Sequence, residues 1–396
     1  MKNNKEFWNN YNKNCLNKLD NLINEKSAKN EDYILADFHI HSNYSSDGAQ
    51  TLSEIIENSK NKGLEVISVT DHDDVRVYDE IFSLIEKGKL PEDIIIIPGI
   101  EHTVSFPKYG TMCHILKHFL CPKDESLLRD IKIVNDSYFN RAKIQINRIF
   151  ENSVLKKIID ENEILISYDD YLNFLEKKGI SVPDYAPLVD YLAEKLLEKN
   201  ISFRKLFEDL IKENENDLSE VRKNMKRERF KKLQTKYANI DVQGNRRFLL
   251  SILAVRGVDD FKFSGYPSSG SLSVDEYGQV DIFKLNHSGI TSFAHPTESS
   301  IFALEDCKSI GGKLVGIEDN FKNPYKNKDL FFDMKNKMNL VLIKGSDVHS
   351  LKENVYENID FYKNDLTEIK RYVLEAKKIY DWFTYSLKFV WWNALS

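Results

Sequence analysis

Short apolar runs alternate with amphipathic stretches in two parts of the chain. Between the early runs, Thr51–Lys62 and Tyr78–Lys87 carry apolar residues at helical spacing. Near-continuous apolar strands that alternate with helices predict a parallel sheet covered by helices, and seven of them favour a closed β/α barrel over an open sheet. The seven runs are Tyr33–His41, Leu64–His72, Ile94–His102, Thr111–Leu120, Ile290–His295, Leu314–Asn320 and Leu340–His349.

The remaining parts of the chain are predicted to be mainly helical. In residues 1–30, Trp8, Tyr11, Cys15 and Leu19 recur at spacings of three and four, which predicts an amphipathic helix packed on the main body, with a flexible lead as the alternative. Residues 125–249 are rich in Lys, Glu, Asn, Leu and Ile and are expected to form a helical insertion. The domains expected are therefore the N-terminal helix (1–30), the barrel (31–124 and 250–355), the insertion (125–249) and a helical tail (356–396).

Composition and charge narrow the classes of protein. The chain has 396 residues, of which 41% are hydrophobic and 30% charged, as in a soluble globular protein. Its net charge of −6 excludes a protein that is basic throughout and binds nucleic acid over its whole surface. No signal peptide or membrane-length apolar run is found, and the four cysteines form no C-x-x-C pair. We therefore expect a cytoplasmic protein with reduced thiols and no membrane contact.

Histidines and carboxylates gather where the predicted strands end. Residues two apart in a strand point to the same face, so His39 and His41 are expected to lie together. The carboxyl ends of barrel strands converge on a common centre, and imidazole and carboxylate ligands without thiolates suit Zn, Mn or Fe. By contrast, His102, His118 and His287 are more typical of capping or core histidines. The strand ends read DFHIHSNYSSDG (37–48), TDHDD (70–74), GIEHT (99–103), CHIL (113–116), FAHP (293–296) and GSDVHS (345–350).

At these residues the chain resembles the PHP (polymerase and histidinol phosphatase) family. The family's H-x-H, T-D-H, G-I-E, lone His, H-P and D-x-H elements occur in that order. The resemblance implies a distorted seven-stranded, TIM-like β/α barrel that holds two or three divalent metal ions. It also implies nine metal ligands that are the catalytic set, in three centres: His39, His41, Glu101 and Asp347; Glu101, His114 and His295; and Asp47, His72 and His349. Asp71 and Asp73 would then orient His72 or hold water, or else form the turn.

The implied activity is metal-dependent phosphoester hydrolysis by a hydroxide that the metals share. No G-x-S-x-G or Walker motif points to serine-hydrolase or P-loop chemistry. The helical insertion resembles that of family members acting on nucleoside phosphates and RNA 5′ ends, but their G-R-P-H element is replaced by GISVPDYAPL at Gly179–Leu188. Arg141 and Arg148 could contact phosphate instead, or could belong to a solvated helix face.

Residues 222–247 form a strongly basic segment, in which Arg227, Arg229 and Lys232 are candidates to contact a substrate. Aromatic residues within it would suit single-stranded nucleic acid, which favours a nuclease-like activity on nucleic acid or nucleotides. An exposed basic helix face is the alternative. Other hypotheses are a small-molecule phosphomonoesterase of the histidinol-phosphatase kind, a C–N hydrolase and a non-catalytic module in a larger complex. A protein partner could dock on the N-terminal helix or the aromatic tail Phe383–Trp392.

Overall fold

The computed structural model describes most of the N-terminal half of the chain and five shorter segments after it. The described residues are 2–45, 48–106, 111–149, 153–180, 185–201, 289–296, 314–320, 328–350, 359–378 and 380. They divide between two compact units, one formed by residues 1–134 and 279–396 and the other by residues 135–278. The domain boundaries expected from the sequence stay a prediction.

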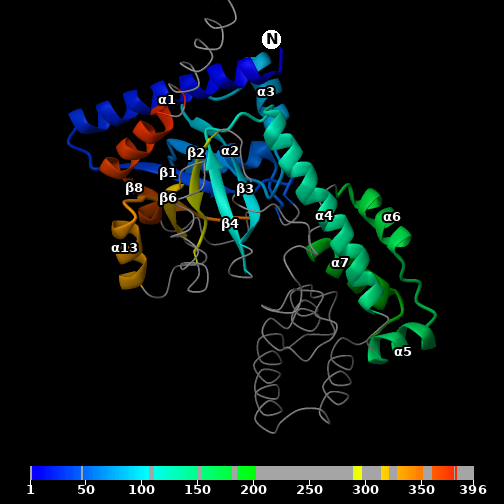
Figure 1. Ribbon diagram of the computed structural model, residues 1–396. Coiled ribbons are helices and arrows are strands. Elements are labelled where there is room, and N and C mark those ends of the chain that lie inside the picture. The colour runs from blue at the N-terminus through cyan, green and yellow to red at the C-terminus, as the bar shows by residue number, and fades with distance from the viewer. Residues whose placement is uncertain are drawn as a thin grey trace, which may run out of the picture. The chain divides into compact units, whose positions relative to one another are not determined.

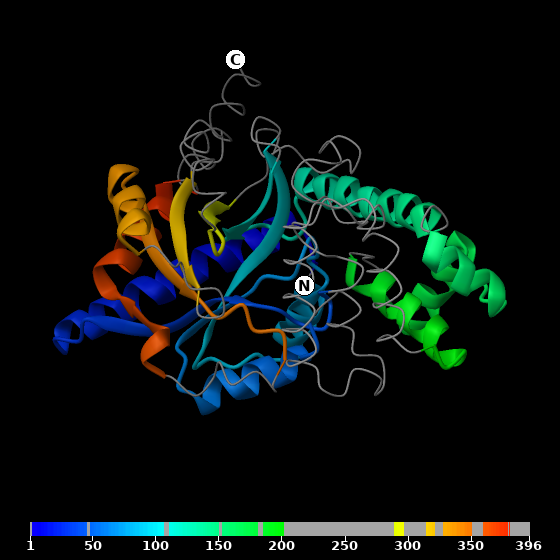
Figure 2. The same ribbon diagram turned by 90° about the horizontal axis from the view of Figure 1, so that it is seen from below.

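The first unit contains one curved sheet whose strands follow chain order. The order is β7-β6-β5-β4-β3-β2-β1-β8, and a parallel bridge between Ile40 and Val348 brings the end of β7 back to β1. The seven strands β1 to β7 thus nearly close a barrel, which confirms the expected fold class (Figures 1 and 2). The strands are β1 Tyr33–Ile40, β2 Val66–Val69, β3 Ile95–Phe106, β4 Thr111–His118, β5 Ile290–Phe293, β6 Leu314–Asn320, β7 Val341–Gly345 and β8 Lys363–Asp365.

Two features of the sheet differ from the expectation. The described sheet has an eighth strand, β8, which pairs antiparallel with the start of β1. In addition, β4 runs antiparallel to both β3 and β5, so the expectation of an all-parallel sheet was wrong. Only residues 107–110 join β3 to β4. This connection is too short for a parallel crossover, and the two strands form a hairpin.

A β-bulge divides β1 into a core part and a site part. Asp37 pairs with Ile67 and Ile40 pairs with Val69, so β1 has one residue more than β2 between these two pairs. Phe38 and Ile40 would share a face in a regular strand. Instead, they belong to two different apolar clusters. The bulge therefore breaks the alternation just before the H-x-H element, as bulges beside functional sites often do.

Helices α1 and α2 begin at residues that cap them. Asn4 accepts a hydrogen bond from the amide of Phe7 at the start of α1, and Thr51 forms a capping box with Glu54 at the start of α2. The described helices include α1 Lys5–Ala28, α2 Leu52–Asn61, α3 Val77–Glu86, α4 Glu125–Ile149, α5 Ser153–Glu161, α6 Tyr168–Lys178, α7 Tyr185–Glu198 and α13 Lys328–Lys337, with a 3-10 turn η6 at Ile359–Tyr362. Residues 366–378 are also helical. None of the helices in the described part of the chain is long and apolar enough to cross a membrane.

Helix α1 packs on the barrel, next to helical residues 366–378. Its apolar stripe buries Trp8, Cys15 and Leu19. The amide nitrogen of Asn12 donates to the carbonyl of Leu120 (2.8 Å) and to the hydroxyl of Tyr380 (2.7 Å). The two helices lie side by side in Figure 1, coloured blue and red. The helix expected in residues 1–30 thus covers apolar barrel surface of its own chain.

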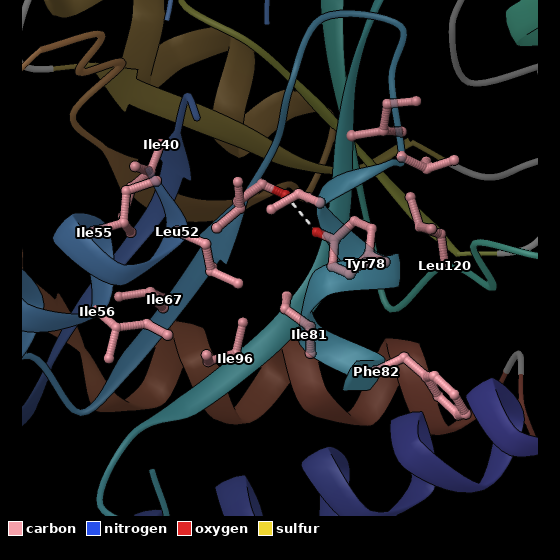
Figure 3. Close-up of a cluster of buried hydrophobic side chains, with 14 of the residues drawn as sticks. Ile40, Leu52, Ile55, Ile56, Ile67, Tyr78, Ile81, Phe82, Ile96 and Leu120 are labelled. Carbon is pink, nitrogen blue, oxygen red and sulfur yellow. Dashed lines mark hydrogen bonds between the residues drawn. The ribbon is translucent and has the colours of Figure 1, made fainter. Parts of the chain in front are cut away.

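Helices α2 and α3 cover the outer face of β1 to β3 with the apolar cluster of Figure 3. Within it, the hydroxyl of Tyr78 donates to the carbonyl of Val69 and accepts from the amide of Gly99 at 2.6 Å. Tyr78 thereby ties α3 to the last residue of β2, immediately before the T-D-H element. The core thus fixes the position at which this candidate site segment leaves the sheet.

The second unit is helical in its described residues. Tyr171 of α6 packs against Tyr191 of α7, with their ring centroids 5.3 Å apart. The Tyr191 hydroxyl donates to Asp170 at 2.8 Å, and Lys195 forms an ion pair with the same carboxylate at 2.7 Å. These contacts join α6 and α7 into a small helical layer.

Candidate metal centre

Eight of the nine ligands implied by the resemblance gather in one place. The side chains form three groups, and within each group the potential ligand atoms all lie within 4.8 Å of one another. They are His39, His41, Glu101 and Asp347; His72, Glu101 and His114; and His41, His72 and His349. His295 joins them through Glu101. The ninth residue, Asp47, lies outside the described residues.

The carboxylate of Glu101 lies at the centre of the cluster. Its Oε2 is 3.0 Å from His39 Nε2, and also lies 3.1 Å from His41 Nε2 and 3.2 Å from His72 Nδ1. Its Oε1 is 3.0 Å from His114 Nδ1 and 2.9 Å from His295 Nε2. The two oxygens therefore face two different groups of histidines, the arrangement that a carboxylate needs to bridge two cations.

Asp347 and His349 complete the cluster from the end of β7. Asp347 Oδ1 lies 3.3 Å from His41 Nε2 and 3.6 Å from His349 Nε2. The His349 ring stacks on that of His41, with centroids 4.4 Å apart and an interplanar angle of 4°. The i, i+2 pair at the end of β7 thus meets the i, i+2 pair at the end of β1.

Backbone hydrogen bonds align these two strand ends. The amide of Asp347 donates to the carbonyl of His39 at 2.9 Å, and the amide of His41 donates to the carbonyl of Val348 at 3.1 Å. Asp347 has φ of 55° and His295 has φ of 24°, both in a region that non-glycine residues rarely adopt. Such positions persist where the surroundings hold them, and they are common at functional sites.

The antiparallel course of β4 places His114 beside Glu101. The pairing opposes Glu101 to Leu116 and Thr103 to His114, so the first half of β4 lies along the last half of β3. In a parallel β4, residue 114 would lie along the first half of β3 rather than the last half. The reversal of β4 is thus what brings the lone His element into the site.

The cluster is buried at one side and accessible at the other. The side chains of His39, His41 and Glu101 have no exposed surface, whereas 32% of the His114 side chain is exposed. His72 and His349 are each 13% exposed. A substrate would therefore approach along the His72, His114 and His349 side.

Charge complementarity governs the titration of the buried groups. Burial lowers the pKa of His39, but the carboxylates of Glu101 and Glu318 outweigh it and hold this pKa well above its ordinary value. Burial raises the pKa of Glu101, but the nearby His39, His72 and His114 hold it well below its ordinary value. The pKa of Asp347 is likewise held below its ordinary value. Burial alone would raise this pKa, but the hydrogen bond to His41 and the nearby histidines outweigh it. The cluster thus combines an ionised acidic centre with a ring of nitrogen donors.

This donor set fits divalent cations. Five imidazole nitrogens crowd within 3.2 Å of one buried carboxylate, and His39 Nε2 is only 3.0 Å from His41 Nε2. Neutral imidazoles have a lone pair on one nitrogen, so such crowding is favourable when the lone pairs converge on a cation. The nitrogen and oxygen donors without sulfur match catalytic rather than structural zinc sites and also suit Mn and Fe.

A second layer of carboxylates surrounds the cluster. Asp71 accepts from the amide and the hydroxyl of Ser42, each at 2.6 Å, and burial raises the pKa of Asp71 to about 6. Asp73 accepts from His102 Nδ1 at 2.7 Å, so His102 contacts this outer carboxylate. The expected role of Asp71 and Asp73 in orienting His72 stays a prediction.

Two carboxylates of this layer were missed at the sequence level. Asp37 accepts from the amide of His39 at 3.1 Å, and Glu318 Oε1 lies 2.8 Å from His39 Nδ1. Both are acidic residues inside otherwise apolar strands, in YILADFHI and LVGIEDN. A buried charge in a core strand normally has a partner, and this signal could have revealed them.

The remaining candidate residues cannot be placed at the site. Arg141 and Arg148 lie within α4, but their side chains are outside the described part. Arg227, Arg229 and Lys232 also lie outside it, as does His287. His118 is a core histidine, with Nε2 2.9 Å from the carbonyl of Phe38 and Nδ1 2.6 Å from the hydroxyl of Tyr372.

Comparison with known proteins gives one family and a few distant structures. The family model of the PHP domain matches residues 37–214. No curated protein sequence matches the chain. A crystal structure of a "putative metal-dependent phosphoesterase" from Bifidobacterium adolescentis is 18% identical, with a TM-score of 0.47 over 85% of this chain and 94% of that one. An amidohydrolase from Chromobacterium violaceum, solved with sulfate and no metal, is 16% identical, with a TM-score of 0.45 over 84% of this chain and 98% of that one. The match of residues 37–214 to the PHP domain and the clustered candidate ligands together support a metal-dependent hydrolase.

Proposed function

We propose that the chain is a metal-dependent phosphoesterase that hydrolyses phosphoester bonds in nucleic acid or nucleotides. The observation that carries this proposal is the convergence of five histidines on the two oxygens of Glu101, with Asp347 and His349 in contact with His41 beside them. His39, His41, Glu101 and Asp347 would hold one divalent ion, and Glu101, His114 and His295 a second. His72 and His349 would hold a third, together with Asp47 as the resemblance implies.

The arrangement suits phosphoester hydrolysis for a physical reason. Divalent ions held there would lower the pKa of water and neutralise charge on phosphate oxygens. Phosphoryl transfer needs positioning and charge neutralisation more than a side-chain nucleophile. Glu101 keeps the two groups of histidines together, and its low pKa keeps it an acceptor at neutral pH. Partly exposed His114 and His72 border the side from which an ester would enter.

The preference for nucleic acid or nucleotides rests on the sequence. Residues 222–247 concentrate lysine and arginine in a chain whose net charge is −6. Such a segment attracts phosphates and, with interspersed aromatic residues, suits single strands. We propose Arg227, Arg229 and Lys232 as substrate contacts, with Arg141 and Arg148 as further candidates. A small phosphomonoester is the alternative substrate.

A substrate panel tests the proposal. Full-length chain loaded with Mn²⁺ or Zn²⁺ is incubated with 5′-labelled RNA, single-stranded DNA, a nucleoside 3′,5′-bisphosphate, p-nitrophenyl phosphate and an amide. Cleavage of phosphate esters but not the amide supports the phosphoesterase, and His39→Ala or Asp347→Ala should abolish it. Full metal loading without ester cleavage would favour a non-catalytic module, and amide cleavage alone would favour a C–N hydrolase.

We also propose a cytoplasmic location and a protein partner. Among the described residues, Cys15 is a free and buried cysteine, as expected in a reducing compartment. Because α1 already buries its apolar stripe in its own chain, we favour the aromatic tail Phe383–Trp392 as the docking element. Deletion of the tail should then abolish co-purification of a partner without reducing ester hydrolysis.

A further inference from the structure

We propose that Glu318 is a positioning residue for two ligands at once, and that Gly345 provides the gap through which it reaches them. The inference rests on the metal site proposed above. It adds to that site a residue that holds His39 in its metal-binding tautomer and fixes the backbone of His295. Glu318 would thus act through these two histidines.

The two oxygens of Glu318 have separate partners. Oε1 lies 2.8 Å from His39 Nδ1, and Oε2 accepts from the backbone amide of His295 at 2.7 Å. Glu318 is only 1% exposed, so both contacts are shielded from water. His39 belongs to the histidine group at Glu101 Oε2, and His295 belongs to the group at Oε1. One carboxylate therefore connects a ligand from each group.

Gly345 permits this long reach. In the sheet, β7 separates β6, which carries Glu318, from the end of β1, which carries His39. A Cβ atom at Gly345 would lie 2.1 Å from Glu318 Oε1 and 2.4 Å from His39 Cβ. Real Cβ atoms do not approach other atoms this closely, so any other residue would force Glu318 and His39 apart. The gap at Gly345 is thus matched to the contact between them.

The chemistry of imidazole gives the contact a function. A neutral histidine carries one ring proton, and a carboxylate at Nδ1 holds the proton there. Nε2 of His39 then presents its lone pair toward Glu101 Oε2, where the cation would lie. Carboxylates in this outer position fix the tautomer and the orientation of a metal-bound histidine and raise its basicity.

The contact with His295 acts on the backbone. His295 has φ of 24°, an uncommon value for a non-glycine residue, and Glu318 accepts from the amide of that same residue. A charge-assisted bond of this kind is among the stronger hydrogen bonds in proteins. It holds His295 in the conformation that places Nε2 2.9 Å from Glu101 Oε1.

The test compares Zn²⁺ binding by the full chain with that of Glu318→Gln. The amide of glutamine has only one acceptor oxygen, so it can serve His39 Nδ1 or the His295 amide but not both. We expect Zn²⁺ affinity, measured by competition with a chromogenic chelator, to fall by about 10- to 100-fold. Gly345→Ala should also lower the affinity for Zn²⁺. The matched control is Asp319→Asn on the same strand, because Asp319 forms its ion pair with Lys328 (2.9 Å) and should leave the affinity unchanged.

The outcomes separate this inference from the proposed function. A wild-type chain that takes up no Zn²⁺ would overturn the metal site and this inference with it. Equal affinity in wild type and folded Glu318→Gln would overturn the inference alone. A second measurement needs no variant: nitrogen NMR of the zinc-loaded wild type should show His39 protonated at Nδ1 and bound through Nε2. A His39 protonated at Nε2 would also overturn the inference.

Discussion

Asp37 accepts hydrogen bonds from both the backbone amide of Ser346 (2.9 Å) and its hydroxyl (2.6 Å). Asp37 lies in β1 and Ser346 directly follows β7, so the pair joins the strands that close the barrel. The H-x-H element begins two residues after Asp37, and the D-x-H element begins one residue after Ser346. Closure of the barrel and assembly of the candidate metal centre therefore depend on the same contact.

Replacement of Ser346 by Ala should loosen this closure. The variant removes the hydroxyl donor and leaves a buried Asp37 oxygen without that bond, which costs about 1–3 kcal/mol. We expect the free energy of unfolding of the metal-free chain, measured in urea, to fall by this amount. Ser126→Ala is a suitable control, because Ser126 donates to Asp124 near the start of α4, away from the β1–β7 closure. Equal stability of wild type and Ser346→Ala would contradict the role given to the Asp37–Ser346 contact.

Glu101→Gln should remove metal binding more completely than any outer-layer change. The glutamine amide has an NH2 group in place of one carboxylate oxygen. In either orientation this donor faces one of the two groups of histidines at Glu101. We expect turnover to fall by more than about 100-fold, beyond the effect of an outer-layer residue. Elemental analysis should show fewer bound ions at an unchanged circular dichroism spectrum. Retention of full metal content would mean that Glu101 does not bridge the ions.

His102 provides the contrast, because it neighbours Glu101 in sequence but contacts Asp73. In His102→Gln, the 2.7 Å contact with Asp73 is weakened or lost, at a cost of about 1–3 kcal/mol in stability. Metal stoichiometry should remain that of the wild type, measured on the same preparation. If His102→Gln loses metal as severely as Glu101→Gln, the assignment of His102 to the outer layer is wrong.

His118 should make stability depend on pH. Burial lowers the pKa of His118 from 6.5 to about 4. The unfolded chain therefore takes up a proton at a higher pH than the folded chain, and stability is lost as the pH falls from about 6.5 to about 4. Between pH 7 and pH 5, this group should account for a loss of about 2 kcal/mol. Over the same pH interval, the free energy of unfolding of His118→Gln should fall by about 2 kcal/mol less than that of the wild type. An identical fall in both chains would contradict a neutral buried His118.

Much of the barrel could be predicted because its strands are apolar runs that end in histidine or acidic residues. The runs beginning at Tyr33 and Leu314 match β1 and β6 closely. The direction of β4 was not predictable from its apolar pattern, since a strand has the same alternation in either direction. The connection between the two apolar runs, residues 103–110, is shorter than a parallel crossover requires and was the available signal for the hairpin.

The candidate ligands stand in motifs of the sequence, whereas the partners of the residues that orient them could not be predicted. Glu318 and Asp37 act across strands that are distant in the sequence, and neither belongs to a motif with fixed spacing. The bulge before His39 is equally invisible, because it follows from how β1 pairs with β2. Tertiary contacts, rather than local preference, decide these features.

Release of p-nitrophenol from bis(p-nitrophenyl) phosphate by the full chain tests most directly whether the candidate metal centre hydrolyses phosphoesters. Turnover is measured on the purified chain, after removal of metal by a chelator, and after Mn²⁺ or Zn²⁺ is added back. We expect activity to disappear with the metal and to return on its addition in the wild type, but not in Glu101→Gln. Turnover that survives complete metal removal, or a fully metal-loaded wild type that leaves this diester and p-nitrophenyl phosphate intact, would contradict a phosphoesterase centred on Glu101.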